Sequence, residues 1–283
     1  MSSNRVGAMT FGDHLCLPYD NDDERNAILL DYIGDGLRSD HKVVYLSAGV
    51  AAGDGAGSGI DGLLGRMTYG TDDAAALSAA LAAGQLETGP WDADEAAVLV
   101  GTAAGLARAQ GYGGVRIIRE PDAAGASGCG LERAFADPGV QAMAVCQYDR
   151  RWFAAAQVER LEACHDGRVV VNALHDDGVL VITPLYAPPG LRLAGAIDES
   201  TLPALRSALL GARRGPHLCL DLSRLDFCDM EGLELLVAAG RGGGVGGMER
   251  QVVLRGVPGY LDLMMRISGW EAVPGVFVEE AAR

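Results

Sequence analysis

Residues 220–233 read Leu-Asp-Leu-Ser-Arg-Leu-Asp-Phe-Cys-Asp-Met-Glu-Gly-Leu, and this stretch decides the fold of the last third of the chain. The apolar run Leu218 to Leu222 predicts a buried strand, and the pattern from Gly232 to Ala239 predicts the helix that follows it. Asp229 and its neighbours therefore lie at the amino end of a helix. Backbone N–H groups and the helix dipole favour an anion at such a position.

The residues on both sides of this stretch continue the same alternation. The predicted elements are strand 191–194, helix 202–212 behind a Ser200/Thr201 cap, strand 252–254 and helix 260–267. Strands that alternate with helices favour parallel pairing within one sheet. We therefore expect a small α/β domain over residues 190–283.

The first two thirds of the chain predict a larger α/β domain. Its predicted strands are 14–19, 42–46, 115–119, 142–148 and 168–171, and its predicted helices are 23–37, 92–110 and 152–164. This order predicts a parallel sheet with helices on both faces. The stretch Pro184 to Gly190 is rich in proline and cannot continue a helix. We place the boundary there, with domains at 1–185 and 190–283.

The charge balance disfavours two classes of partner. The 283 residues include 23 basic and 38 acidic side chains, a net charge of -15. Nucleic acids and anionic membranes both attract positive surfaces, so we expect neither as a principal partner. No apolar run reaches the roughly 18 residues of a membrane span, and the N-terminus has no signal-peptide pattern. Six cysteines without a Cys-x-x-Cys pair indicate reduced thiols, so we expect a cytoplasmic protein.

The sequence lacks the common catalytic motifs. Lys42 is the only lysine, and it does not stand in the Gly-Lys-Ser/Thr pattern of a P-loop. Gly57-x-Gly59-x-x-Gly62 matches a dinucleotide fingerprint formally, but about ten residues separate it from the preceding strand, whereas the fingerprint turns directly off a strand. No Ser-His-Asp order, Gly-x-Ser-x-Gly or His-Glu-x-x-His is present. We therefore expect no enzymatic activity.

His14 and Cys16 form the first candidate site. Residues i and i+2 of a strand point to the same face, so the imidazole and the thiol would lie side by side. A neighbouring imidazolium would lower the thiol pKa, and the pair could bind a metal, react with an electrophile or line a pocket. Cys146 and the adjacent pair Cys164 and His165 would complete a metal site if the fold brought them together. The alternative is a buried cysteine and a hydrogen-bonded histidine, because the spacing is not a zinc signature.

A second candidate site lies at the end of predicted strand 142–148. Polar side chains, including Tyr148 and Asp149, follow Cys146 there, and the carboxyl ends of strands carry ligands in open α/β sheets. The alternative is that Asp149 caps the helix starting near Trp152 while the two following arginines face solvent. The sequence leaves both interpretations open.

The C-terminal motif resembles the STAS family, the sulfate transporter and anti-sigma factor antagonist domains. Their pattern is a strand ending in Asp-Leu-Ser, followed by a Phe-x-Asp-Ser-Ser-Gly-Leu turn that opens a helix. Residues 193–198, Leu-Ala-Gly-Ala-Ile-Asp, resemble the family's early Gly-x-x-Asp strand. The resemblance covers nearly all of residues 190–283. It implies that Asp198, Asp229, Met230 and Gly232 form a partner-binding surface.

Glu231 occupies the position of the family's phosphoacceptor serine. In anti-sigma factor antagonists an anti-sigma factor kinase phosphorylates that serine, and the serine before it is here replaced by Met230. The resemblance therefore implies that the phosphoacceptor is absent. Glu231 either imitates a phosphate with about half its charge or marks a domain that has lost its switch.

The N-terminal domain resembles the MEDS family, named for methanogen/methylotroph sensory domains. The matching stretches are His-Leu-Cys-Leu-x-Tyr at 14–19, Asn-Asp-Asp-Glu-Arg at 21–25, Lys-Val-Val-Tyr-Leu at 42–46, Gly-Gln-Leu at 84–86 and Cys-Gln-Tyr-Asp at 146–149, followed by His165. The resemblance implies a RecA-like α/β fold without an active P-loop that senses small molecules. Its implied sensing site comprises His14, Cys16, Tyr19, Cys146, Tyr148, Asp149 and His165.

The two resemblances together predict a cytoplasmic signalling protein in transcription regulation. A small-molecule or redox sensing domain would control a STAS module that binds an anti-sigma factor, a related kinase or another STAS protein. The cofactor is unknown, and the sequence leaves open whether the chain forms a homo-oligomer. The alternative is a metal- or haem-binding redox sensor, or a degenerate enzyme, that uses the His14/Cys16 region.

Overall fold

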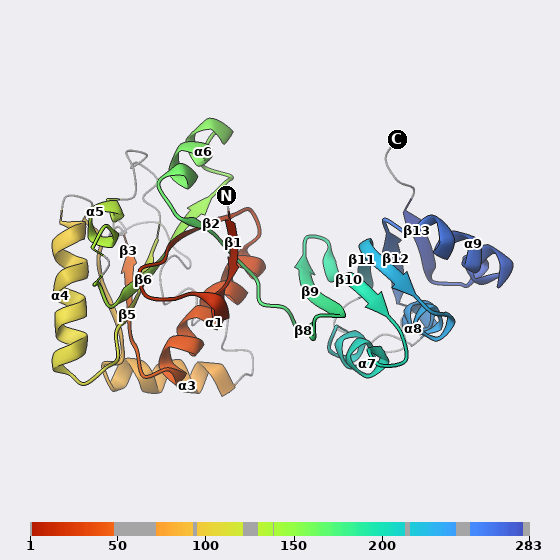
Figure 1. Cartoon of the computed structure of the whole chain (residues 1–283), viewed down its shortest axis with the longest axis horizontal. Helices are drawn as coiled ribbons and strands as arrows, with labels where there is room; N and C mark the ends of the chain where they lie inside the picture. The colour runs from red at the N-terminus through yellow and green to blue at the C-terminus, as the bar shows by residue number, and fades with distance from the viewer. Residues whose placement is uncertain are drawn as a thin grey trace. The chain divides into compact units, whose positions relative to one another are not determined.

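In a computed structural model the protein forms two compact units, Met1–Asn172 and Ala173–Arg283 (Figure 1). The structure describes residues 2–47, 72–92, 95–120, 130–137, 139–212, 216–241 and 250–279. The glycine pattern at residues 57–62 lies outside the described residues. Both units combine a sheet with helices, so the α/β prediction is confirmed.

A parallel sheet forms the centre of the first unit. Among the described residues its strand order is β1-β7-β2-β6-β5-β3-β4, and all its pairs are parallel. The strands are β1 (Ser2–Arg5), β2 (His14–Tyr19), β3 (Lys42–Ser47), β4 (Leu86–Pro90), β5 (Val115–Arg119), β6 (Ala142–Asp149) and β7 (Gly167–Val170). The helices are η1 (Val6–Ala8), α1 (Asp22–Arg38), α3 (Asp72–Ala82), α4 (Ala96–Ala109), α5 (Glu132–Phe135) and α6 (Ala155–Ala163).

Helices cover both faces of this sheet, with α4 and α1 on opposite sides (Figure 1). Val100 and Ala104 of α4 belong to a buried core that includes Ile117 of β5. On the other face, the Tyr32 hydroxyl of α1 donates a hydrogen bond to the Met143 carbonyl at 2.9 Å. Because both faces are covered, β6 is buried along its whole length.

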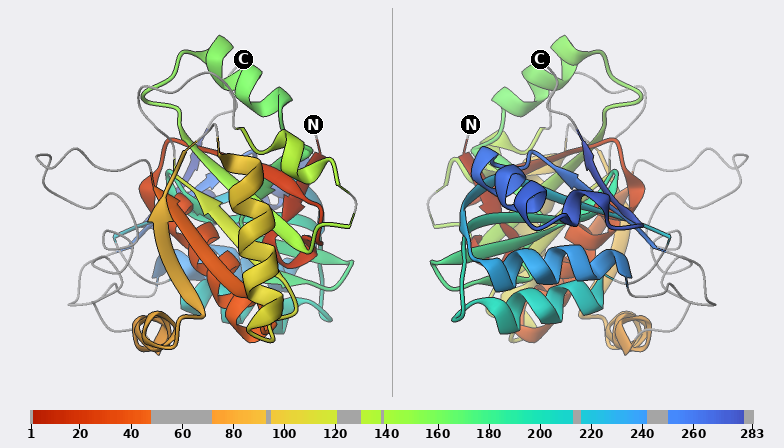
Figure 2. Two further views of the ribbon diagram at one scale, coloured as in Figure 1. Left: turned by 90° about the vertical axis from the view of Figure 1, so that its left-hand side faces the viewer. Right: turned by 90° about the vertical axis from the view of Figure 1, so that its right-hand side faces the viewer.

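The second unit contains a six-stranded mixed sheet among the described residues, in the order β13-β12-β11-β10-β9-β8. Its strands are β8 (His175–Asp176), β9 (Leu180–Tyr186), β10 (Pro189–Ile197), β11 (His217–Cys228), β12 (Gln251–Arg255) and β13 (Val276–Glu279). Its helices are α7 (Leu202–Gly211), α8 (Met230–Arg241), α9 (Gly259–Ile267) and η2 (Trp270–Ala272). Helices α7 and α8 lie side by side, and their buried leucines join the sheet in one core (Figure 2).

The units divide earlier in the chain than the proline-rich stretch indicates. Pro184 to Gly190 form the turn and flanking pairs of the antiparallel β9–β10 hairpin, where Leu191 pairs with Pro184. Leu180 and Ile182 of β9 are fully buried in the second unit's core. Proline fits here because β8 pairs only with the first half of β9, so no described strand pairs with Pro184 on that side.

Two predicted helix starts also differ from the structure. Helix α4 begins at Ala96, four residues after the predicted start at residue 92. Thr201 precedes α7, but its hydroxyl accepts from the Asp198 amide at 2.9 Å instead of capping the helix. Within the described part of the chain, no helix has the length and apolar character to cross a membrane.

Candidate functional site

Three side chains that commonly bind metals meet inside the first unit. They are His14 at the start of β2, Cys146 in β6 and His165 directly after α6. One donor atom from each lies within 4.8 Å of the other two. His14 Nε2 and Cys146 Sγ are 3.4 Å apart, and the two imidazole centroids are 4.2 Å apart. The fold thus brings together three of the residues that the sequence named as a conditional metal set, and Cys16 and Cys164 are not part of the cluster.

Backbone pairing explains why these residues meet. Cys16 and Cys146 are register partners in the parallel β2–β6 pair, so His14, two residues before Cys16, lies on the same face of the sheet. After α6 the chain returns to the start of β2. There the Asp166 carboxylate accepts from the His14 amide, and the Asp166 amide donates to the His14 carbonyl, both at 3.0 Å. These two bonds fix His165 beside the cluster.

The hydrogen bonding of His165 defines its tautomer. Its Nδ1 lies 2.6 Å from the Leu161 carbonyl, and because a carbonyl oxygen only accepts, Nδ1 carries the hydrogen. His165 Nε2 is buried and has no hydrogen-bond partner among the described residues. In the neutral ring this nitrogen presents a lone pair inside the protein.

Aromatic rings enclose the cluster. Phe135 of α5 stacks on the His14 ring, with centroids 5.2 Å apart and planes 11° apart. The Tyr148 ring meets the His165 ring edge-on at 5.6 Å. The Tyr148 hydroxyl accepts a hydrogen bond from Arg119 at 3.0 Å. These contacts hold both imidazoles in place and limit the space around them.

Cys16 shares this face of the sheet but has a different partner. Its thiol donates to the Gly167 carbonyl at 3.3 Å. Burial, followed by the charge of Glu162, raises the pKa of this thiol from 9.0 to about 12. The expectation that His14 lowers the Cys16 pKa is therefore wrong, because desolvation of the thiolate outweighs any neighbouring positive charge.

Tyr19 and Asp149 end β2 and β6, at the opposite end of β2 from His14. The Asp149 carboxylate accepts from Arg151 through Nε at 2.8 Å, Nη2 at 2.6 Å and the backbone amide at 2.9 Å. Helix α6 begins only at Ala155, so Asp149 is not its cap. The Arg25 guanidinium lies 5.4 Å from the centre of the Tyr19 ring. Both predicted site residues are thus engaged in local pairs outside the cluster.

In the second unit, the amino end of α8 is capped by Asp229. Its carboxylate accepts from the Gly232 amide at 2.7 Å, and its carbonyl accepts from the Leu233 amide at 3.0 Å. A Cβ on Gly232 would lie 2.3 Å from Ile197 Cγ2 and 3.0 Å from Cys228 Sγ. The motif therefore needs glycine because α8 packs directly onto the ends of β10 and β11.

Glu231 and Met230 point outward at this helix end. Glu231 lies 4.0 Å from Arg206 of α7, and 61% of its side chain is exposed. Met230 and the nearby Phe227 are about half exposed, at 47% and 50%. The Asp198 carboxylate accepts from the Ser200 amide and hydroxyl, and the hydroxyl bond is the main cause that lowers its pKa. Asp198, Asp229 and Gly232 therefore shape the turn, whereas Met230 and Glu231 are accessible.

A family model for MEDS, the methanogen/methylotroph, DcmR sensory domain, matches residues 13–166, which is more than half of the chain. The chain belongs to the MEDS family. A second model, described as Mlab, STAS domain, matches residues 186–279. The MEDS domain is therefore followed by a STAS domain, as the sequence resemblances predicted.

Among solved structures, the STAS domain is similar to an anti-sigma factor antagonist from Mycobacterium paratuberculosis. The two are 26% identical over 36% of this chain and 80% of that chain, with a TM-score of 0.27. No curated protein matches the chain.

The carboxyl end of the MEDS sheet contains a buried polar group that includes Gln147, from the predicted polar run after Cys146, and two residues that were not predicted, Tyr45 and Arg119. Gln147 is fully buried, and its Nε2 donates to the Tyr45 hydroxyl at 3.3 Å. Burial raises the pKa of Tyr45 to about 12. Arg119 lies 4.8 Å from the centre of the Trp91 ring and is also buried. Little in the sequence indicated Tyr45 and Arg119, because each follows apolar residues within a buried strand.

Lys42 has a structural role in the MEDS domain. Its ammonium donates to the Gly84 carbonyl at 2.9 Å, to Glu87 at 2.6 Å and to Gln110 at 2.8 Å. An ammonium has three N–H donors, so these bonds use all of them. The single lysine of the sequence therefore has no donor left for a phosphate.

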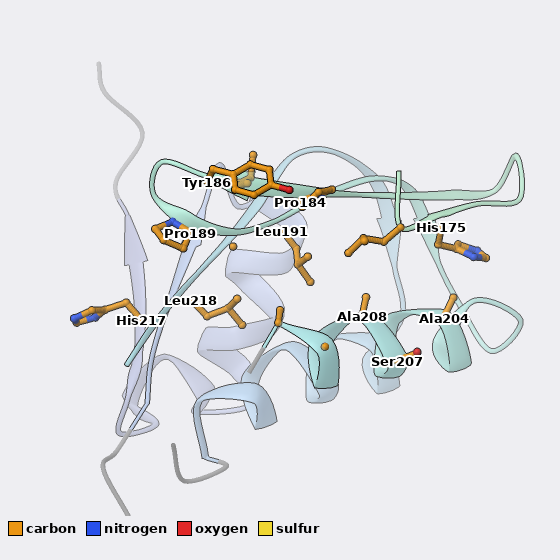
Figure 3. A pocket seen from close by; sticks show the side chains of 15 residues that line it. His175, Pro184, Tyr186, Pro189, Leu191, Ala204, Ser207, Ala208, His217 and Leu218 are labelled. Carbon is orange, nitrogen blue, oxygen red and sulfur yellow. The ribbon is translucent and has the colours of Figure 1, made fainter. Parts of the chain in front are cut away.

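The STAS domain contains a pocket of about 590 Å³ between the β9–β10 hairpin and α7 (Figure 3). Leu191, Leu218 and Ala208 line it, and His175 and His217 stand at its two ends with their rings turned away from the centre. The pocket thus lacks convergent polar groups, unlike the cluster in the MEDS domain.

Proposed function

We propose that the MEDS domain binds a small ligand and thereby controls the binding of a protein partner to the STAS domain. The partner class is an anti-sigma factor or a related kinase, because that is the class expected for a STAS domain of this pattern. Ligand and partner act as linked equilibria, so the ligand must favour one of two states of the chain. The proposal assigns no catalytic step to either domain.

The observation that carries the partner role is the exposed apolar surface at the amino end of α8. Phe227 and Met230 are half exposed there, directly beside Glu231. Tyr260 of α9, close enough to Cys228 to be affected by its charge, is also partly exposed, at 37%. Exposed apolar residues grouped around a charged one are typical of protein interfaces, where they are buried on binding.

The ligand role is assigned to the cluster of His14, Cys146 and His165 with the Tyr148 ring. It combines buried polar atoms with aromatic walls, which is the usual composition of a small-molecule site. The five cysteines among the described residues are thiols, which supports a reducing, cytoplasmic location. The metal- or haem-binding alternative uses the same cluster.

Partner capture with surface variants tests the proposal. Tagged full-length protein should retain a protein with an anti-sigma factor or kinase-type domain from its native lysate. Met230→Arg should lose that protein, because it places a charge in the proposed interface. Phe277→Arg is the matched control, since Phe277 of β13 is also an exposed apolar residue, at 50%. Equal capture by both variants would show that the partner uses another surface.

A further inference from the structure

We propose that His14, Cys146 and His165 bind a zinc-class divalent ion and leave its fourth coordination position open to a small ligand. The inference deepens the ligand role proposed for the MEDS domain and rests on it only for the link to the STAS domain. Ion binding itself stands on the geometry of the cluster.

The donors form a set that suits such an ion. Two imidazoles and one thiolate are ligands that zinc accepts in tetrahedral sites, at about 2.0–2.1 Å for nitrogen and 2.3 Å for sulfur. Three donor atoms within 4.8 Å of one another can reach a common ion at those distances after small side-chain adjustments. The three ligands come from β2, β6 and the segment after α6, so the ion would join separate parts of the fold.

The second observation is the unsatisfied nitrogen of His165. Its Nδ1–H donates to the Leu161 carbonyl, so Nε2 holds a lone pair that is buried without a partner. Metal-binding histidines usually donate their other ring N–H to a carbonyl or carboxylate in this way. A simple histidine–thiol hydrogen bond accounts for the His14–Cys146 contact but leaves His165 Nε2 unexplained.

Among the described residues, no fourth His, Cys, Asp or Glu donor joins the three, so that part of the chain supplies no ligand for the fourth position. Glu162 is held by Arg168 and lies 4.0 Å from Arg150. The Cys164 thiol donates to the Arg160 carbonyl at 3.3 Å. Three protein ligands with an exchangeable fourth position are characteristic of zinc sites that bind small molecules. The Phe135 and Tyr148 rings would restrict that position to small Lewis bases.

Binding would release one proton, because the Cys146 thiol loses its hydrogen as the sulfur–metal bond forms. The divalent charge then compensates the buried thiolate. The ion keeps its oxidation state throughout.

Cobalt titration of the full-length, metal-stripped protein tests the site. One equivalent of Co²⁺ should produce a thiolate-to-cobalt charge-transfer band with intense visible bands of tetrahedral cobalt, and Zn²⁺ should abolish both. Adding azide should shift the visible bands. Cobalt binding without the charge-transfer band would overturn the site, and no shift with azide would overturn the open position.

Three variants make the test specific. Cys146→Ser should lose the charge-transfer band, and His165→Gln should weaken cobalt binding at least about tenfold. Cys164→Ser, which changes the thiol next to His165, should behave as wild type. Loss of the band in Cys164→Ser but not in Cys146→Ser would contradict the assignment. A negative cobalt result leaves the partner-capture test unaffected, so failure of this site and failure of the signalling role are distinguishable.

Discussion

The cluster in the MEDS domain and the amino end of α8 in the STAS domain differ in how their residues are brought together. His14 lies far from Cys146 and His165 in the sequence. The three meet because β2 pairs with β6 and because the chain returns to the start of β2 after α6. Asp229 to Gly232 are consecutive and form their geometry locally. His14 and Cys146 are buried and His165 is partly buried, whereas Glu231 and Met230 face solvent. A buried site built from distant segments suits ligand detection, and an exposed local turn suits partner binding.

The boundary between the two domains gives the largest expected effect. A fragment of residues 173–283 keeps β8 and β9, whereas a fragment of 190–283 loses them and exposes the core beneath Leu180 and Ile182. Burying two such side chains stabilises a fold by about 3–6 kcal/mol. We expect cooperative urea unfolding for the longer fragment and a much lower midpoint for the shorter one. Equal midpoints would show that the β9–β10 hairpin is dispensable.

Gly232 tests how tightly the local turn is packed. Gly232→Ala should destabilise the STAS domain by about 1–3 kcal/mol, because the new Cβ meets Ile197 at 2.3 Å. Gly259→Ala, at the start of α9, adds a Cβ in open space and serves as control. Thermal unfolding of both variants measures the difference. If the control is affected as strongly, the close approach of α8 to β10 does not explain the glycine.

Cys16 tests whether burial of a thiol in the MEDS domain makes the stability of the fold depend on pH. Its folded-state pKa of about 12 lies above its ordinary 9.0, so the native state favours the protonated thiol. The stabilisation that this pKa difference gives the folded state is fully present below pH 9. It is lost as the pH rises toward 12, by about 1.4 kcal/mol per pH unit. The free energy of unfolding, measured with urea, should therefore fall more steeply between pH 9 and pH 12 in wild type than in Cys16→Ala. The half-buried Cys164 supplies the control variant Cys164→Ala, which should follow wild type.

Glu231 gives the smallest expected effect, at the exposed site. If its carboxylate imitates a phosphate that weakens partner binding, Glu231→Ser should bind the captured partner several-fold more tightly and accept phosphate from a kinase-type partner. Glu234→Ser, one turn further along α8, should do neither. Titration with and without ATP measures both properties. Unchanged affinity and no phosphate transfer would show that the domain has left the phosphorylation switch.

Much of the architecture could be predicted because its strands are apolar and its helices amphipathic. The bounds of β2 and β5 agree with the sequence prediction. One of the strands that the sequence did not predict is β1. It reads Ser-Ser-Asn-Arg and is a strand because it pairs with β7. The boundary was misplaced because prolines in a strand edge resemble those of a linker. Local composition does not record such tertiary pairing.

The two sites also differ in how much of their geometry follows from local sequence. The helix end at Asp229 could be predicted because its cap acts within three residues, although α8 begins at Met230 and not at Gly232. The close packing of Gly232 against Ile197 of β10 could not be predicted from local sequence. The spacing of His14 and Cys16 indicated a pair on one face of a strand, but it did not reveal that Gly167 would take the Cys16 thiol. The approach of His165 depends on the path of α6, which no local pattern encodes.

In the proposed mechanism, the cluster of His14, Cys146 and His165 controls partner binding at the amino end of α8. The most direct test is to measure the affinity of the captured partner for full-length protein with and without Zn²⁺, in wild type and in His165→Gln. We expect Zn²⁺ to change the affinity of wild type for the partner at least about fivefold and to leave the affinity of His165→Gln unchanged. Equal wild-type affinities with and without Zn²⁺, at concentrations where the ion is shown to bind, would contradict it.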